Sequence, residues 1–203
     1  MGSQMKDPIE FWYEFGSTYS YLSVMRIAAV AEAAGADVIW RPFLLGPIFA
    51  DQGWKDSPFK LYPAKGRYMW RDLERLCEDY KLEFKRPSVF PRNGLGAARV
   101  ACVASNEGWC EGFTRAVFTA NFAQDRDIED VQVLAEILSD LNRDPAAILE
   151  SSNSSANKER LRRQTEEAKR RGIFGAPSFT VGDELFWGND RLGTAVAWSL
   201  GLR

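Results

Sequence analysis

Two strand-like segments separated by a helical segment open the chain, and this arrangement restricts its fold more than any other feature. Residues 9–15 read Ile-Glu-Phe-Trp-Tyr-Glu-Phe, an aromatic run that predicts a buried strand. Gly16 ends the run, apolar residues at helical spacing follow from Ser20, and residues 38–43 predict a second strand. Strands joined by a helical crossover pair in parallel within one sheet. The chain therefore opens with a βαβ unit.

The rest of the chain predicts a helical block and then a hairpin. Residues 46–66 are dense in glycine and proline, which predicts a long loop that is functional or mobile. Apolar stripes at helical spacing run through residues 69–138, a helix begins at Asp144-Pro145, and a charged helix covers residues 157–171. Strands at 178–181 and 184–187 flank Gly182-Asp183, a hairpin signal. A closing helix spans residues 190–200, with Asn189 as its cap.

The resulting order of elements is βαβ, helices, ββα. This order predicts an α/β chain with a thioredoxin fold and a large all-helical insertion. We expect residues 8–45 and 172–203 to form the thioredoxin-like domain. Residues 46–171 would form a loop and a helical insertion domain.

Composition excludes several classes of function. The 203 residues contain no histidine, which removes Ser-His-Asp and Cys-His catalysis and histidine-bearing zinc sites. The three cysteines form no CxxC pair, so we expect buried thiols and no metal site. A net charge of -2 argues against a nucleic-acid partner. No apolar run reaches the roughly 18 residues of a membrane span, so we expect a cytoplasmic protein without membrane attachment.

Two segments predict a binding site. The turn of residues 15–20 joins a buried strand to a helix N-terminus, where free N–H groups favour an anion, and it carries Ser17 and Ser20 at CxxC spacing. Ser17 cannot act as a thiolate, but its hydroxyl can donate to a thiolate from a cofactor, or it can simply cap the helix. The Ala176–Pro177 bond, if cis, would turn the backbone of Ala176 toward Ser17, where it could pair with an extended peptide.

Four segments of the chain resemble the 2-hydroxychromene-2-carboxylate isomerase family, which is kin to kappa-class glutathione transferases and DsbA-like proteins. They are Phe-Gly-Ser-Thr-Tyr-Ser-Tyr-Leu at 15–22, Pro-Ala-Lys-Gly-Arg-Tyr-Met at 63–69, Phe-Gly-Ala-Pro at 174–177 and Trp-Gly-Asn-Asp-Arg-Leu at 187–192. The segments occur in the family's order, and the resemblance extends from about residue 9 to residue 200.

The resemblance implies glutathione as cofactor and a role for each matching residue. Ser17 would be the catalytic serine that holds the glutathione sulfur as a thiolate, and Lys65 would bind the glycine carboxylate. The backbone of Ala176, set by Pro177, would pair with the cysteinyl residue. Asn189 and Asp190 would hold the γ-glutamyl end. Without the resemblance, Lys65 is a solvated charge and Asn189-Asp190 a helix cap.

Aromatic side chains near these segments could enclose a planar substrate, although each could also serve in the core. They are Tyr19, Tyr21, Trp54, Tyr62 and Trp187. The chain departs from the family at Thr18, where proline is usual, and at Trp54, where kappa-class relatives place asparagine. The first departure bears on the rigidity of the turn or on substrate preference, and the second on the identity of the second substrate.

The resemblance implies a glutathione-dependent cis-trans isomerase for 2-hydroxychromene-2-carboxylate or a related unsaturated aromatic acid. The resemblance also makes a homodimer possible. The alternatives are a kappa-like glutathione transferase or peroxidase, which consumes glutathione, and a non-catalytic thioredoxin-like binding module. A dithiol oxidoreductase is disfavoured because neither Ser17 nor Ser20 can form a disulfide.

Overall fold

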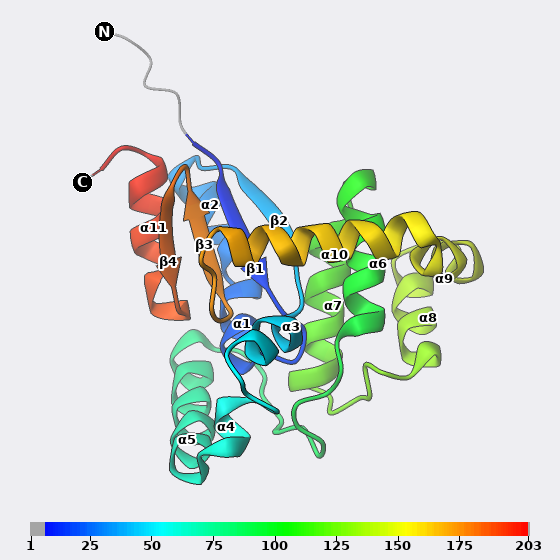
Figure 1. Ribbon diagram of the computed structural model, residues 1–203, viewed down its shortest axis with the longest axis horizontal. Coiled ribbons are helices and arrows are strands. Elements are labelled where there is room, and N and C mark those ends of the chain that lie inside the picture. Colours follow the sequence, from blue (N-terminus) through cyan, green and yellow to red (C-terminus); the bar gives the residue numbers. More distant parts are fainter. Residues whose placement is uncertain (1–6, 203) are drawn as a thin grey trace, which may run out of the picture.

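A four-stranded mixed sheet forms the centre of the thioredoxin-like part (Figure 1). The computed structural model describes residues 7–202. The strand order is β2-β1-β3-β4, formed by β1 (Ile9–Tyr13), β2 (Val38–Pro42), β3 (Ser178–Val181) and β4 (Glu184–Trp187). Strands β1 and β2 are parallel, whereas β3 is antiparallel to both of its neighbours, β1 and β4. The expected βαβ unit and hairpin are therefore confirmed.

The two faces of the sheet contribute to two apolar clusters because side chains alternate along β1. Phe11 and Tyr13 belong to the large cluster that continues into the helical block, and Phe11 stacks on Phe179 with ring centroids 5.3 Å apart. Trp12 points the other way, into a small cluster with Phe43 and Ile48. Burying a phenylalanine side chain contributes roughly 2 kcal/mol. The ends of β1 and β3 that carry the predicted site are thus packed on both faces.

Helices cover the sheet and form a block beside it (Figure 1). The helices outside the insertion are α1 (Thr18–Val24), α2 (Ile27–Ala34), η1 (Asn189–Arg191) and α11 (Leu192–Ser199). Of these, α2 packs against β2, and α11 packs against β1, β3 and β4. The insertion consists of α3 (Leu45–Asp51), α4 (Pro58–Leu61), α5 (Pro63–Tyr80), α6 (Leu95–Glu107), α7 (Cys110–Phe122), α8 (Val131–Asp140), α9 (Pro145–Asn153) and α10 (Ser155–Arg170). In Figure 1, α10 crosses in front of the sheet, and α6–α9 lie to its right. No helix within residues 7–202 is long and apolar enough to cross a membrane.

The prediction of a loop over residues 46–66 is wrong. This stretch contains most of α3, all of α4 and the first turn of α5. Pro58 and Pro63 each stand in the first turn of a helix, where the missing N–H costs no hydrogen bond. The prolines therefore mark helix starts.

The first helical segment is also interrupted. Helix α1 ends at Val24 and α2 begins at Ile27, with Met25 and Arg26 between them. Gly35 ends α2 in the left-handed conformation with φ of 68°, as a C-terminal cap should. The interruption leaves α1 as a seven-residue helix that carries the Ser17 turn.

Candidate functional site

The Ser17 hydroxyl joins the first and third family-like segments. Its Oγ donates to the Ala176 carbonyl oxygen at 3.0 Å and accepts from the Ser20 backbone N–H at 3.3 Å, as the N-cap of α1. The Ala176–Pro177 bond is cis, as expected. The same hydroxyl therefore both caps the helix and faces the proline turn. Residues 159 positions apart in sequence meet at this point.

The fourth segment packs against the same turns. The Gly188 backbone N–H donates to the Pro177 carbonyl oxygen at 2.9 Å. The buried Asn189 Oδ1 accepts from Ser23 Oγ at 3.1 Å and from Arg26 Nη1 at 3.2 Å. Asn189 therefore faces α1 and does not cap the closing helix, which corrects the prediction. Its neighbour Asp190 is exposed.

The 63–69 segment reaches the site from helix α5. The buried Thr18 Oγ1 donates to Met69 Sδ at 3.1 Å, so this hydroxyl faces the interior and not a substrate. Lys65 is exposed, and its Nζ lies 4.9 Å from the centroid of the Tyr62 ring. Lys65 and Tyr62 thus form one cationic and aromatic corner at the start of α5.

The predicted substrate-facing aromatic residues divide into exposed and buried ones. The Trp187 side chain is 53% exposed and packs on Phe174, with ring centroids 4.8 Å apart. Tyr62 is 49% exposed, whereas the half-buried Trp54 packs on Phe49. Tyr21 is 1% exposed, and its hydroxyl donates to the Glu83 carbonyl oxygen. Its position in the core corrects the prediction that it encloses a substrate.

Tyr19 connects α1 to α5. Its hydroxyl donates to Asp72 Oδ2 at 2.8 Å, and its ring centroid lies 6.1 Å from that of Phe59. Desolvation, with a smaller contribution from Asp72, raises the pKa of the Tyr19 phenol well above its usual value. Tyr19 is therefore a neutral hydrogen-bond donor at any physiological pH.

A cleft of about 570 Å³ opens between α5 and residues 86–90. Its lining is mainly aromatic and cationic and includes Phe59, Lys60, Arg67, Trp70, Arg86 and Phe90. The Arg86 guanidinium carbon lies 4.7 Å from the centroid of the Trp70 ring. The cationic excess favours an anionic ligand, and the rings favour a planar one. None of the aromatic residues predicted from sequence lines this cleft.

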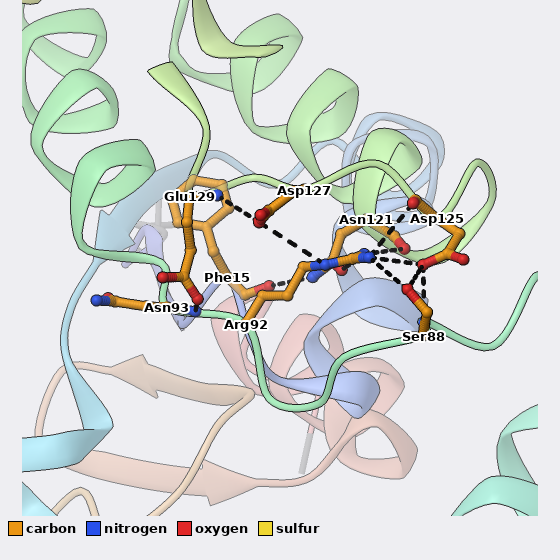
Figure 2. Close-up of polar contacts among 8 residues, drawn as sticks. All are labelled: Phe15, Ser88, Arg92, Asn93, Asn121, Asp125, Asp127 and Glu129. Atoms are coloured by element: carbon orange, nitrogen blue, oxygen red, sulfur yellow. Dashed lines mark hydrogen bonds and ion pairs between the residues drawn. The ribbon is translucent and has the colours of Figure 1, made fainter. Parts of the chain in front are cut away.

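A partly buried polar network contacts the start of the Ser17 turn at the Phe15 carbonyl oxygen (Figure 2). Asn121 on α7 donates from Nδ2 to the Phe15 carbonyl oxygen at 3.1 Å, and its Oδ1 accepts from Arg92 Nη1 at 2.9 Å. The Arg92 side chain is 3% exposed and forms an ion pair with Asp125 at 2.6 Å. The Ser88 N–H, followed by Arg92, lowers the Asp125 pKa to about 2. Sequence reasoning missed this network, because its members are single polar residues spread over separate segments.

Glu14 is another residue near the site that sequence reasoning missed. It follows β1 directly, and its Oε2 accepts from the Gly16 backbone N–H at 3.0 Å. Desolvation raises the pKa of the Glu14 carboxyl to about 7, against the opposing effect of the Gly16 hydrogen bond. A glutamate at the end of an otherwise buried aromatic strand was the available signal.

Comparison with known proteins identifies the family. The family model described as a DSBA-like thioredoxin domain matches residues 8–197. A 2-hydroxychromene-2-carboxylate isomerase of Sphingobium xenophagum is 30% identical over 188 residues, covering 93% of this chain and 95% of that protein. Human glutathione S-transferase kappa 1 is 27% identical over 199 residues, covering 91% of this chain and 87% of that protein.

Solved structures give the same result. A 2-hydroxychromene-2-carboxylate isomerase superposes with a TM-score of 0.85 at 25% identity, covering 95% of this chain and 94% of the other. A cytosolic disulfide reductase, DsbM of Pseudomonas aeruginosa with GSH, shares the fold with a TM-score of 0.64 at 16% identity, covering 96% of each chain. The chain therefore belongs to the DSBA-like thioredoxin domain family, and within it to the 2-hydroxychromene-2-carboxylate isomerases.

Proposed function

We propose that this protein is a glutathione-dependent cis-trans isomerase that acts on 2-hydroxychromene-2-carboxylate or a related unsaturated aromatic acid. The proposal rests on one observation above all, the 3.0 Å hydrogen bond between Ser17 Oγ and the Ala176 carbonyl oxygen. This bond brings a hydroxyl donor next to the backbone that precedes β3. A cysteinyl residue needs both groups, one for its sulfur and one for its main chain.

The residues present fit glutathione. Ser17 can turn its O–H from Ala176 toward a sulfur, and the Ala176 carbonyl is then free to accept from the cysteinyl N–H. Lys65, exposed at the start of α5, offers a cation for a carboxylate. Asp190 is exposed on the fourth segment and can meet an ammonium group. Asn189 would support that segment through its bonds to α1.

The reaction requires little more from the polypeptide than positioning and electrostatics. Bound glutathione would supply a thiolate that adds reversibly to an activated double bond and leaves after rotation about the resulting single bond. Ser17 stabilises the negative charge by donating its hydrogen bond. Exposed aromatic faces such as Trp187 and Tyr62 would exclude water from a planar substrate. The cationic cleft beside α5 suits an acidic substrate.

Calorimetric titration with glutathione tests the cofactor, and an absorbance assay with 2-hydroxychromene-2-carboxylate tests the reaction. We expect Ser17→Ala to reduce kcat about 100-fold, as removal of a single donor to a developing charge does elsewhere. The matched control is Ser20→Ala in the same turn. Ser20 Oγ is buried and has no hydrogen-bond partner within residues 7–202, so its removal should leave the rate unchanged. Absence of glutathione binding to the unmodified protein would refute the proposal.

A kappa-like glutathione transferase is the second candidate, supported by the similarity to human glutathione S-transferase kappa 1. The fate of glutathione separates the two functions. An isomerase returns every glutathione molecule unchanged, whereas a transferase consumes one for each conjugate formed. A non-catalytic binding module would have no isomerase or transferase activity, so Ser17→Ala would change no rate.

A further inference from the structure

The Glu14 carboxyl occupies a tight site at the base of the Ser17 turn. Besides the hydrogen bond from the Gly16 N–H to its Oε2, both carboxyl oxygens lie against glycine backbone. A Cβ added to Gly94 would lie 2.9 Å from Oε1, and one added to Gly16 would lie 3.2 Å from Oε2. Added Cβ atoms would also collide with the Arg92 carbonyl oxygen, 2.8 Å from that of Gly16, and with the Phe15 Cβ, 2.7 Å from that of Gly94. The glycines thus leave room for an acidic side chain directly beneath the turn.

Glu14 itself has no cationic partner within residues 7–202. The segment packed on it, residues 91–94, carries one charged side chain, Arg92, whose guanidinium pairs with Asp125 and lies 3.9 Å from Asp127. The Asn93 backbone N–H of the same segment donates to Glu129 Oε1, so it is not a donor to Glu14. A carboxyl that is partly buried without a cation favours its protonated form, and burial accordingly raises the pKa of Glu14 to about 7.

Glu14 is also close to the position that the proposed function assigns to a negative sulfur. Gly16, which donates to the carboxyl, directly precedes Ser17 in the chain. With 3.8 Å between consecutive Cα atoms, the carboxyl and a sulfur on Ser17 Oγ would be roughly 8 Å apart. Two negative charges at that separation in a partly buried turn repel each other enough to lower the thiolate-to-thiol ratio about tenfold whenever Glu14 is ionised.

We propose that Glu14 and a glutathione thiolate at Ser17 compete for a single negative charge, so that thiolate formation is accompanied by protonation of Glu14. The inference rests on the proposed function, because it requires glutathione at Ser17. In the balanced step the S–H bond breaks, the proton is taken up as an O–H bond on the Glu14 carboxylate, and the net charge of the turn stays at -1. Glu14 is a positioning residue in this scheme, since its contact with the site is through Gly16.

Proton release on glutathione binding measures the coupling directly. Titration calorimetry at pH 7 in two buffers of different ionisation enthalpy gives the number of protons released. Glu14 is about half ionised at this pH, so uptake by Glu14 should reduce the release from the wild-type protein by about half a proton relative to Glu14→Gln. The bound thiolate, followed by its ultraviolet absorbance, should also form at lower pH in Glu14→Gln. Its thiolate-to-thiol ratio should exceed that of the wild-type protein about twofold at pH 7, where Glu14 is half ionised, and about tenfold at a pH where Glu14 is fully ionised.

Two controls make the result specific. S-methylglutathione cannot form a thiolate, so its binding should release equal numbers of protons from wild type and Glu14→Gln. Glu32→Gln, on the exposed side of α2, removes a carboxyl remote from the turn and should behave as wild type. If Glu14→Gln does not fold, infrared difference spectra of the wild-type protein test the same step. Glutathione, but not S-methylglutathione, should then increase the protonated-carboxyl band.

The outcomes separate the two levels of the proposal. If glutathione binds and wild type and Glu14→Gln release the same number of protons, the coupling is wrong and the proposed function stands. An unchanged carboxyl band on glutathione binding overturns the coupling in the same way. If neither glutathione nor S-methylglutathione binds, the proposed function fails and the coupling fails with it.

Discussion

Replacing Asn121 by alanine should destabilise the protein strongly, because Asn121 joins the helical insertion to the Ser17 turn. Its amide donates to the Phe15 carbonyl oxygen and accepts from Arg92, and the residue is 1% exposed. The substitution leaves the Phe15 acceptor unsatisfied, at a cost of about 1–1.5 kcal/mol. It also removes a charge-assisted bond from Arg92, for about 1.5 kcal/mol more. Arg92 Nη1 then keeps only its 3.4 Å contact to the Asn121 carbonyl oxygen, whereas Nη2 keeps its ion pair with Asp125.

We therefore expect Asn121→Ala to lower the free energy of unfolding by about 3 kcal/mol, which corresponds to a decrease in Tm of roughly 6–12 °C. Urea denaturation followed by circular dichroism measures the change, which should move the midpoint and leave the m-value as it was. The control is Asp127→Asn. This residue contacts the same arginine at 3.9 Å, but its side chain is 61% exposed, so we expect a loss below about 0.5 kcal/mol.

A loss below about 1 kcal/mol for Asn121→Ala would refute the assignment of Asn121 as the support of the turn. An equal loss for Asp127→Asn would refute it as well, since the exposed contact would then matter as much as the buried one. With the fold retained, glutathione affinity should decrease in Asn121→Ala and remain unchanged in Asp127→Asn, because only the first variant frees the Phe15 carbonyl.

Three further outcomes follow from packing and burial. Gly175→Ala should destabilise the protein by about 1–3 kcal/mol in urea and shift the tryptophan fluorescence, since its Cβ would lie 2.5 Å from Trp187 Nε1. Gly193→Ala, in α11 with open space around the added Cβ, should instead stabilise by about 0.5–1 kcal/mol in the same assay. Burial raises the pKa of Cys77 to about 11 and that of Cys102 to about 12, so both thiols should react with a disulfide reagent at pH 8 only after unfolding. Labelling of either thiol within minutes in the native protein would contradict this.

The order of elements was predictable because it depends on local periodicity. The aromatic run before Gly16 and the Gly182 turn specified the first strand and the hairpin, and Gly182 adopts φ of 57° in the structure. Asp144 caps α9 through its side chain, with Pro145 in the first turn, as the residue types indicated. Prediction failed where one residue type has two uses, because proline ends helices and also begins them.

For the candidate site, the meeting of the two backbone turns was predictable, but the directions of the side chains were not. Ser17 and Ala176 meet as the topology required, because the two turns lie at the same end of β1 and β3. The direction of a side chain was not predictable from its residue type. Asparagine is a common helix cap, yet the Asn189 amide oxygen accepts hydrogen bonds from Ser23 and Arg26. Tyr21 resembles a substrate-facing residue in sequence and lies in the core.

The Ser17 hydroxyl has one proton, which it donates to the Ala176 carbonyl oxygen. Under the proposed function, a sulfur can be stabilised only if it replaces Ala176 as the acceptor, which leaves the Ala176 carbonyl without a partner. A simple thiol such as 2-mercaptoethanol would therefore exchange one hydrogen bond of Ser17 for another. It would leave the Ala176 carbonyl oxygen without a donor, at a cost of about 1–3 kcal/mol. A cysteinyl peptide brings its own N–H to that carbonyl and avoids this cost. The hydrogen bond between Ser17 and Ala176 thus favours a peptide thiol such as glutathione over small thiols.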